Sequence, residues 1–298
     1  MKSTAKPIDY IILLLGVATA ATAIIMIKKS SLSPVYLAGL RLILAAFITL
    51  PFFIKEKRKE ATPIATVIKS TWQPGLALGT HFILWTQGAR MIPAANASLV
   101  VNMMPIFMPF TVYLIFREKI NTVEIFATFL AMIGLGFIVI DDISLSSDYF
   151  LGNLVCMAGM ILLTIYLALG KRRITFKGLW IYLTPLYFFG GVFCLATEVA
   201  IHGWELTIPP RDFLAAILLA IFPTVIGHGI FNRSMRIMRP QIVSLINLFQ
   251  VAFAGLYGYF LFHEIPEILF IPALIFILGG SVIAIKGQSE KTGASVAQ

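Results

Sequence analysis

The sequence predicts an all-α integral membrane protein, and three observations lead to that prediction. The chain of 298 residues is 59% hydrophobic and only 12% charged, whereas a soluble domain carries about 25% charged residues. Long apolar runs follow one another with short polar gaps, and the longest polar stretch, Lys55–Gln73, is too short for a soluble domain. Most basic residues fall in those gaps, which is typical of loops that face cytoplasm and anionic lipid rather than nucleic acid.

Ten apolar runs are long enough to form membrane-spanning helices, because about 20 residues are needed to cross a hydrocarbon core about 30 Å thick. The basic start and apolar first run resemble a signal peptide, but the many spans that follow favour a retained first helix. A polar tail at 287–298 is expected to be disordered in the cytoplasm. Cuts at charges, prolines and glycines place the spans at 9–27, 34–54, 74–91, 94–116, 121–140, 149–169, 178–200, 212–232, 239–262 and 267–286.

The distribution of lysine and arginine predicts that both ends of the chain are cytoplasmic. With the amino end inside, 18 of the 23 basic residues lie in cytoplasmic gaps, four lie outside, and Arg41 lies within a span. This split follows the positive-inside rule and requires an even number of spans. We therefore expect a multi-pass protein of the cytoplasmic, or inner, cell membrane.

The second half of the chain repeats the first at an offset of 146 residues. Sliding 85–140 onto 231–286 aligns nine identical residues without a gap, and "YLIFREK" falls on "YFLFHEI". Five spans are an odd number, so the second copy enters the membrane upside down, and the loop charges change sides as the positive-inside rule requires. We expect two inverted five-helix repeats, 1–144 and 145–286. The most informative identities are Arg90/Arg236, Ser98/Ser244, Glu118/Glu264 and Gly134/Gly280.

This organisation resembles the EamA family of the drug/metabolite transporter superfamily over nearly the whole chain. The resemblance is carried by "AANASLVVNMMPIF", "RPQIVSLINLFQVAFAGLYGYFLFHE", "LAGLRLILAA" and "IGHGIFNRSMR", and by a glutamate that closes the fourth helix of each half. It implies a ten-helix carrier of small molecules; the family includes exporters of amino acids and other metabolites, and its relatives move sugars, nucleotide sugars and cations. The first span lacks the glutamate on which small multidrug/proton antiporters of the superfamily depend.

Glu118 and Glu264 are expected to be structural residues. Each lies at the end of a span rather than at mid-membrane, beside the start of the next helix. Unpaired N–H groups and a partial positive charge at that start favour a nearby carboxylate. A proton or cation relay is the alternative.

Two intramembrane histidines, His81 and His228, are candidates for lining a substrate cavity. They occupy corresponding places in the third and eighth spans, and each has a partner one turn on, Trp85 and Asn232. Packing histidines with satisfied hydrogen bonds are the alternative. A histidine also titrates near neutral pH, so either ring is a candidate proton carrier.

The fourth span carries a polar stripe that is expected to face the protein interior. Ser98, Asn102, Pro105 and Pro109 lie within about 60° of one another on a helix. Prolines free backbone carbonyls, which in a membrane must face protein or a wet cavity. Asn102 is a candidate substrate contact, whereas the two prolines are structural.

The ninth span has a similar composition. Asn247 and Gln250 are candidate substrate contacts, while Gly255 and Gly258 are structural positions at which the helix bends or packs. In the third span, Gly75-x-x-x-Gly79 is a close-packing pattern.

Arg41 lies about seven residues into the second span, where a cation needs a partner, a cavity or a route to the surface. A contact to a substrate carboxylate and a structural anchor to backbone carbonyls are both open interpretations.

No motif of an enzyme is present: the chain has no P-loop, no H-E-x-x-H and no G-x-S-x-G. Cys156 and Cys194 lie inside apolar runs and are interpreted as small hydrophobes, so no metal and no cofactor is expected. The expected partners are a small-molecule substrate and membrane lipid, without nucleic acid, and the chain is a monomer or homodimer.

The sequence therefore predicts a secondary transporter that exports a small metabolite such as an amino acid. Proton-coupled efflux of toxic compounds is the alternative within transport, and a non-transporting membrane assembly or sensory subunit is the alternative from another class. The candidate substrate-binding residues are His81, Trp85, Asn102, His228, Asn232, Asn247, Gln250 and Arg41.

Overall fold

Helices account for nearly all of the chain that the computed structural model describes, and those residues contain no strand. The described residues are 5–92, 97, 100–117, 121–139, 147–173, 176–203, 207–262 and 270–294. The elements are α1 (Pro7–Ala21), α2 (Ala23–Lys29), α3 (Pro34–Lys59), α4 (Ile64–Met91), α6 (Met104–Phe116), α7 (Thr122–Val139), α8 (Ser147–Arg173), α9 (Trp180–His202), α10 (Pro210–Leu219), the π-helix η1 (Ala220–His228), α11 (Gly229–Ile237), α12 (Pro240–Asn247), α13 (Phe249–Phe262) and α14 (Phe270–Ala294).

Within the described part of the chain, six helical stretches are long and apolar enough to cross a membrane. The prediction of an all-helical chain with several membrane-length helices is thereby confirmed, while the crossing of all ten predicted spans stays a prediction. The six stretches are Pro7–Lys29, Pro34–Lys59, Phe150–Lys171, Trp180–His202, Pro210–Ile237 and Pro240–Tyr257.

Proline marks the start of several helices, because its fixed φ suits the first turn and its missing N–H would have no partner there. Pro7, Pro34, Pro210 and Pro240 are the first residues of α1, α3, α10 and α12. Ser33 caps α3 in addition, since its hydroxyl accepts a hydrogen bond from the N–H of Tyr36 at 2.9 Å.

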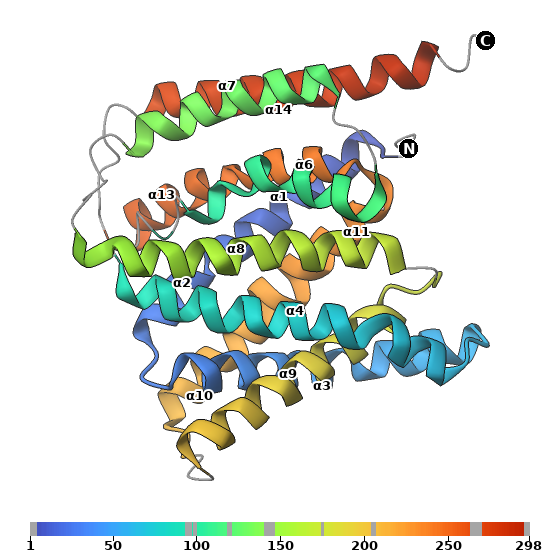
Figure 1. The fold of residues 1–298 in the computed structure, drawn as a ribbon, viewed down its shortest axis with the longest axis vertical. Coiled ribbons are helices and arrows are strands. Elements are labelled where there is room, and N and C mark those ends of the chain that lie inside the picture. Colours follow the sequence, from blue (N-terminus) through green and yellow to red (C-terminus); the bar gives the residue numbers. More distant parts are fainter. Residues whose placement is uncertain are drawn as a thin grey trace.

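The helices form layers, and α7 and α14 lie side by side at one edge (Figure 1). Helices α3, α4, α8 and α9 pack closely on the other side of the bundle, where α10 lies beside α3, and α6 and α13 lie between α8 and the α7–α14 pair. Helix α1 begins and α14 ends at the same end of the bundle. We call this the terminal end, and we call the opposite end, where α2 stops and α3 begins, the far end.

Glycines set the spacing of the packed helices. A Cβ on Gly75 of α4 would lie 2.7 Å from the Leu186 carbonyl oxygen of α9, and one on Gly280 of α14 would lie 2.5 Å from the Ala127 carbonyl oxygen of α7. Only glycine permits such backbone approach, which is the close packing that small residues provide in membranes.

Four of the predicted spans are interrupted where the structure describes them. Thr22 separates α1 from α2, and η1 forms the middle of the α10–α11 helix. Met103 precedes α6, and Leu248 separates α12 from α13. At both of these last two positions the N–H bonds the carbonyl three residues earlier, at 3.1 Å. The interruptions at Met103 and Leu248 lie in the predicted fourth and ninth spans and are 145 residues apart.

Two arginines hold helix connections at opposite ends of the bundle. Arg90, in the last turn of α4, donates to carbonyls around the α2–α3 connection at the far end. Arg236, near the end of α11, donates to carbonyls of the α8–α9 connection at the terminal end. The two residues are the pair that the sequence offset aligns. The acceptors are Ile27, Ser30 and Leu32 for Arg90, and Phe176, Lys177 and Gly178 for Arg236.

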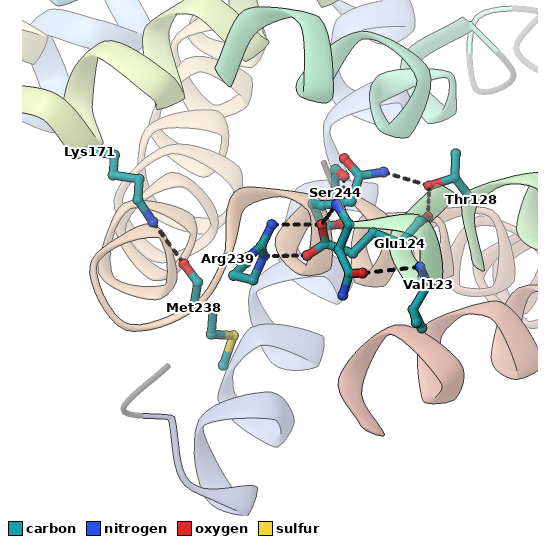
Figure 2. Close-up of polar contacts among 9 residues, drawn as sticks. Val123, Glu124, Thr128, Lys171, Met238, Arg239 and Ser244 are labelled. Atoms are coloured by element: carbon teal, nitrogen blue, oxygen red, sulfur yellow. Dashed lines mark hydrogen bonds and ion pairs between the residues drawn. The ribbon is translucent and has the colours of Figure 1, made fainter. Parts of the chain in front are cut away.

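Two lysines complete this pattern. At the far end Lys28 donates to the Ile92 carbonyl at 2.9 Å, and at the terminal end Lys171 donates to the Met238 carbonyl at 3.0 Å, as Figure 2 shows. A cation near the last carbonyls of a helix is favoured by their partial negative charge. Each half of the chain therefore ties the same pair of helix ends together by a lysine and an arginine.

Candidate functional site

A cluster of buried rings lies where helices from both halves of the chain meet. His81 on α4 and His228 at the end of η1 are 3% and 6% exposed, and their ring centroids lie 6.2 Å apart. The pairing of these two histidines agrees with their corresponding places in the sequence.

The hydrogen bonds of the two histidines differ. Nδ1 of His81 lies 2.6 Å from the carbonyl oxygen of Gly159 on α8. A carbonyl only accepts, so Nδ1 carries the proton and Nε2 of a neutral ring is left as an acceptor. Nδ1 of His228 is buried and has no hydrogen-bond partner among the described residues. A buried polar atom of that kind indicates a place for water or a ligand.

Aromatic side chains surround His228. The rings of Phe82, Tyr166 and Phe231 have centroids 5.1, 5.8 and 6.0 Å from that of His228. They come from α4, α8 and α11, and all three are buried. The cluster is thus mainly aromatic, with few polar groups among the rings, a composition that it shares with small-molecule sites.

Asn232 connects this cluster to α8. Its amide nitrogen donates to the hydroxyl of Tyr166 and to the carbonyl of His228 at 2.7 Å. Its amide oxygen is buried and has no hydrogen-bond partner among the described residues. The Asn232 amide oxygen lies toward Gly170 of α8, where a Cβ added to that glycine would be 3.1 Å away.

Arg41 places a guanidinium against the same cluster. The side chain is 1% exposed, and its Nε and Nη2 donate to the Thr224 hydroxyl of η1 at 3.0 and 2.8 Å. Its Cζ lies 3.7 Å from the centroid of the Phe82 ring, a cation–π contact. The contacts of Arg41 among the described residues are thus a hydroxyl and a ring, and both interpretations of Arg41, as a substrate contact and as a structural anchor, stay predictions.

The π-helical turn positions Thr224. Pro223 has no N–H to donate, and a π-turn is a common device at functional sites. The Thr224 hydroxyl donates to the Leu219 carbonyl five residues earlier at 2.7 Å, and the Thr224 carbonyl accepts from the hydroxyl of Tyr187 at 3.1 Å. One threonine therefore joins α3, α9 and η1.

The other predicted substrate contacts are Trp85, Asn102, Asn247 and Gln250. Trp85 is buried one turn from His81, yet Phe82 makes the ring contacts with His228. Asn102 and Asn247 are buried immediately before the interruptions at Met103 and Leu248. Asn247 and Gln250 share no hydrogen bond with the histidine pair in the part of the chain that is described. Their role as substrate contacts stays a prediction.

The predicted structural residues are only partly described. Glu118 and Glu264 lie outside the described residues, as does Ser98. Pro105 and Pro109 are buried in α6, and the carbonyl of Pro105 accepts a hydrogen bond from Gln241 at 3.0 Å. The predicted positions Gly255 and Gly258 both fall within α13.

A second polar cluster, which the sequence did not indicate, lies at the terminal end. Figure 2 shows Arg239, just before α12, directed at the carboxylate of Glu124 in the first turn of α7. Gln241 donates to the Thr128 hydroxyl at 2.6 Å. Glu124 lies early in a predicted span and Arg239 precedes a proline, but nothing in the sequence pairs them.

Comparison with known proteins identifies the fold and the family. Residues 8–140 and residues 150–286 each match the EamA-like transporter family. The chain belongs to the EamA-like transporter family. The resemblance noted in the sequence is thereby confirmed, and the two EamA matches fall inside the two predicted repeats.

One similar sequence is an "Uncharacterized transporter" of Clostridium kluyveri, which is 22% identical over 266 residues, covering 86% of this chain and 85% of that protein. A solved structure described only as "Crystal structure of protein" has a TM-score of 0.76 at 13% identity, covering 94% of this chain and 98% of that chain. At that identity the structure shows the fold alone. This EamA protein is therefore a multi-pass membrane protein of a transporter family.

Proposed function

We propose that the protein is a secondary transporter that exports a small metabolite, such as an amino acid, by alternating access. The observation that carries the proposal is the buried cluster around His81 and His228. It combines side chains of α3 and α4 from the first matched stretch with those of α8, η1 and α11 from the second. Substrate sites of inverted-repeat transporters lie between the repeats near the membrane midplane.

Ten spans in two inverted repeats, with both termini cytoplasmic, are part of this proposal. The arrangement is supported by the lysine and arginine contacts described above, which tie corresponding helix ends at the far end in one half and at the terminal end in the other. The interrupted helices α6 and α12–α13 are the segments that bend as the halves move. Glu118 and Glu264 have a structural role at the turns that follow them.

Within the site, ring faces hold the apolar part of the substrate, and His228, Asn232 and Arg41 supply polar contacts. Asn102, Asn247 and Gln250 contact the substrate as the interrupted helices bend, and Trp85 supports His81. The membrane is the cytoplasmic one, as the positive-inside distribution favours.

Flux measured in proteoliposomes tests the proposal. Purified protein is reconstituted and assayed with radiolabelled amino acids, amines, sugars and nucleotides, after a thermal-shift screen has selected ligands. A ligand that binds only the folded state stabilises it by about 2.7 kcal/mol at a hundred times its dissociation constant. We expect flux of at least one metabolite, and its loss in His228→Ala. Absence of flux for the entire panel would contradict transport and favour the non-transporting subunit; an unreactive Asn247→Cys in labelling would support the same conclusion.

Proton-coupled efflux of toxic compounds is the second candidate, and the close pairing of His81 with His228 favours it. Two imidazoles 6.2 Å apart cannot both carry a charge in a buried site without a large cost, so the pair holds at most one proton, which a coupled transporter would load and release. This candidate requires that an imposed pH gradient drives flux in the wild type and not in His228→Gln. Flux that is indifferent to the gradient would exclude it.

A further inference from the structure

Among the residues that the structure describes, the guanidinium of Arg41 is a buried charge without an ionic partner. No described carboxylate lies within 4.0 Å of it: the ion pairs among the described residues are His202–Glu198, Arg233–Asp9 and Arg239–Glu124. The acids whose side chains are described all lie near the ends of helices, whereas Arg41 lies inside α3. These acids are Asp9, Glu56, Glu60, Glu124, Glu198 and Asp212.

Arg41 also makes fewer hydrogen bonds to the described residues than its five N–H groups allow. A guanidinium has five N–H groups in a flat fork that matches the two oxygens of a carboxylate. In the structure Nε and Nη2 both point at one oxygen, the hydroxyl of Thr224. That pair of nitrogens is the edge with which arginine normally binds a carboxylate in a bidentate manner, so one hydroxyl stands where two oxygens would fit.

The contact between Arg41 and Thr224 joins the two halves of the chain. Arg41 belongs to α3 in the first matched stretch, and Thr224 belongs to η1 in the second. The ring of Phe82 lies against both the guanidinium and His228. A ligand whose carboxylate met Arg41 would therefore find ring surfaces next to it for its apolar part.

We propose that Arg41 and Thr224 form a carboxylate-exchange switch, in which a substrate carboxylate replaces the Thr224 hydroxyl on the guanidinium. The substrates are then small carboxylates with an apolar or aromatic part, and neutral amides and simple amines are excluded. Taking Arg41 away from Thr224 also releases α3 from η1, so that occupancy loosens one tie between the halves. This inference rests on the proposed transport function and specifies its substrate class.

Matched ligands test the carboxylate requirement. The full chain in lipid nanodiscs is titrated with phenylalanine, phenylalaninamide and phenethylamine, and with leucine, leucinamide and isopentylamine. Binding is measured by thermal shift and by calorimetry. We expect that at least one acid binds, and that its amide and amine bind at least about tenfold more weakly, since a charged bidentate hydrogen bond is lost.

Variants assign that difference to Arg41. Arg41→Gln is expected to bind the acid and the amide equally, whereas Arg211→Gln, which removes an exposed arginine of α10, retains the discrimination. Folding of each variant is verified by its elution profile and its unliganded melting temperature. A folded Arg41→Gln that still prefers the acid overturns the inference, as does a wild type that prefers no acid over its amide.

Thr224 supplies a test that does not alter the arginine. Thr224→Val keeps the shape of the side chain and removes the hydroxyl, so the unliganded protein loses the resting partner of Arg41 while the liganded protein does not. We expect carboxylates to bind about tenfold more tightly to Thr224→Val, within the range for a hydrogen bond to a charged group. Thr224→Ser, which keeps the hydroxyl, should bind as the wild type does. Weaker binding to Thr224→Val than to Thr224→Ser would overturn the exchange.

Flux separates this inference from the proposed function. If acids bind through Arg41 but nothing crosses the membrane in proteoliposomes, transport fails and the switch stands as a binding site. If amides and amines are transported as well as the acids, transport stands and the carboxylate switch fails.

Discussion

The helices α4 and α9 differ from the helices α10–η1–α11 and α12–α13 in how they hold their places. The first two are continuous and meet at Gly75 and Gly190, where the backbone of one helix touches that of the other. The other two are interrupted in their middle, by a π-turn and at Leu248. Backbone contacts leave little freedom to move, whereas an interrupted helix already has weak points in its hydrogen-bond ladder.

This difference separates helices that are held by backbone contacts from helices that are interrupted. The glycine-packed groups, α3–α4–α8–α9 and α7–α14, are suited to act as fixed supports. The interrupted helices carry His228, Asn232, Thr224 and Asn247. The candidate substrate contacts thus lie mainly on interrupted helices, and the glycine-packed helices border them.

The largest expected effect comes from separating the α7–α14 pair from the interrupted α12. Glu124→Ala leaves Arg239, whose side chain is 23% exposed, without its ionic partner. Removing one member of a buried ion pair costs about 3 to 5 kcal/mol, and the exposure of Arg239 favours the lower value. The free energy of unfolding in mild detergent, measured with denaturant, tests this.

The double variant Glu124→Ala/Arg239→Ala serves as the control for that prediction. It removes both charges and should be more stable than the sum of the two single losses predicts. Strict additivity of the two losses would show that the pair does not couple α7 to α12.

The next effect contrasts two glycines directly. Gly75→Ala places a Cβ 2.7 Å from the Leu186 carbonyl oxygen, whereas Gly229→Ala, on the interrupted helix, places one 3.7 Å from the nearest atom, in the Trp180 ring. We expect a loss of about 2 to 3 kcal/mol for Gly75→Ala and a change within about 0.5 kcal/mol for Gly229→Ala. Equal losses would remove the distinction between packed and interrupted helices.

Sequence reasoning found the packed helices more easily than the interrupted ones. Packed helices follow from patterns that can be read directly in the sequence. These patterns are the apolar runs, the internal repeat and Gly75-x-x-x-Gly79. The positions of prolines in the sequence do not identify the interruptions. Pro74 lies inside the continuous α4, whereas the interruption at Leu248 has no proline beside it. Interruptions depend on which neighbours satisfy the freed backbone groups, and those neighbours are distant in sequence.

The candidate site shows the same division. The corresponding positions of His81 and His228 indicated a pair, because two rare polar residues recur in the two halves. Phe82 is one of 24 phenylalanines, so nothing in the sequence distinguishes it as the ring beneath Arg41. Thr224 lies four residues before His228 in the sequence, but its hydrogen bonds to Arg41 need the π-helical turn, which no pattern of side chains predicts.

A smaller effect is expected at the two arginines that join packed and interrupted helices. Arg90→Gln frees carbonyls near the α2–α3 connection, and Arg236→Gln frees those of the α8–α9 connection. Each should cost about 1.5 kcal/mol, the low end for hydrogen bonds to a charged group, because both sites lie at the ends of the bundle. Unfolding measurements on the two variants should give similar losses. A loss in only one of them would contradict an equivalent role in the two halves.

The smallest expected effect tests whether side-chain hydrogen bonds help to hold an interrupted helix against a packed one. The hydroxyl of Thr111 on α6 lies 2.9 Å from that of Thr164 on α8, whereas the hydroxyl of Thr197 on α9 donates only to the Phe193 carbonyl of its own helix, at 2.8 Å. Thr111→Val should therefore lose about 0.6 kcal/mol more than Thr197→Val, the average for a hydrogen bond between membrane helices. Both changes preserve side-chain shape, so packing is matched in the comparison. If the two variants unfold alike, α6 is held by packing alone, and its freedom to bend is limited by its neighbours rather than by this bond.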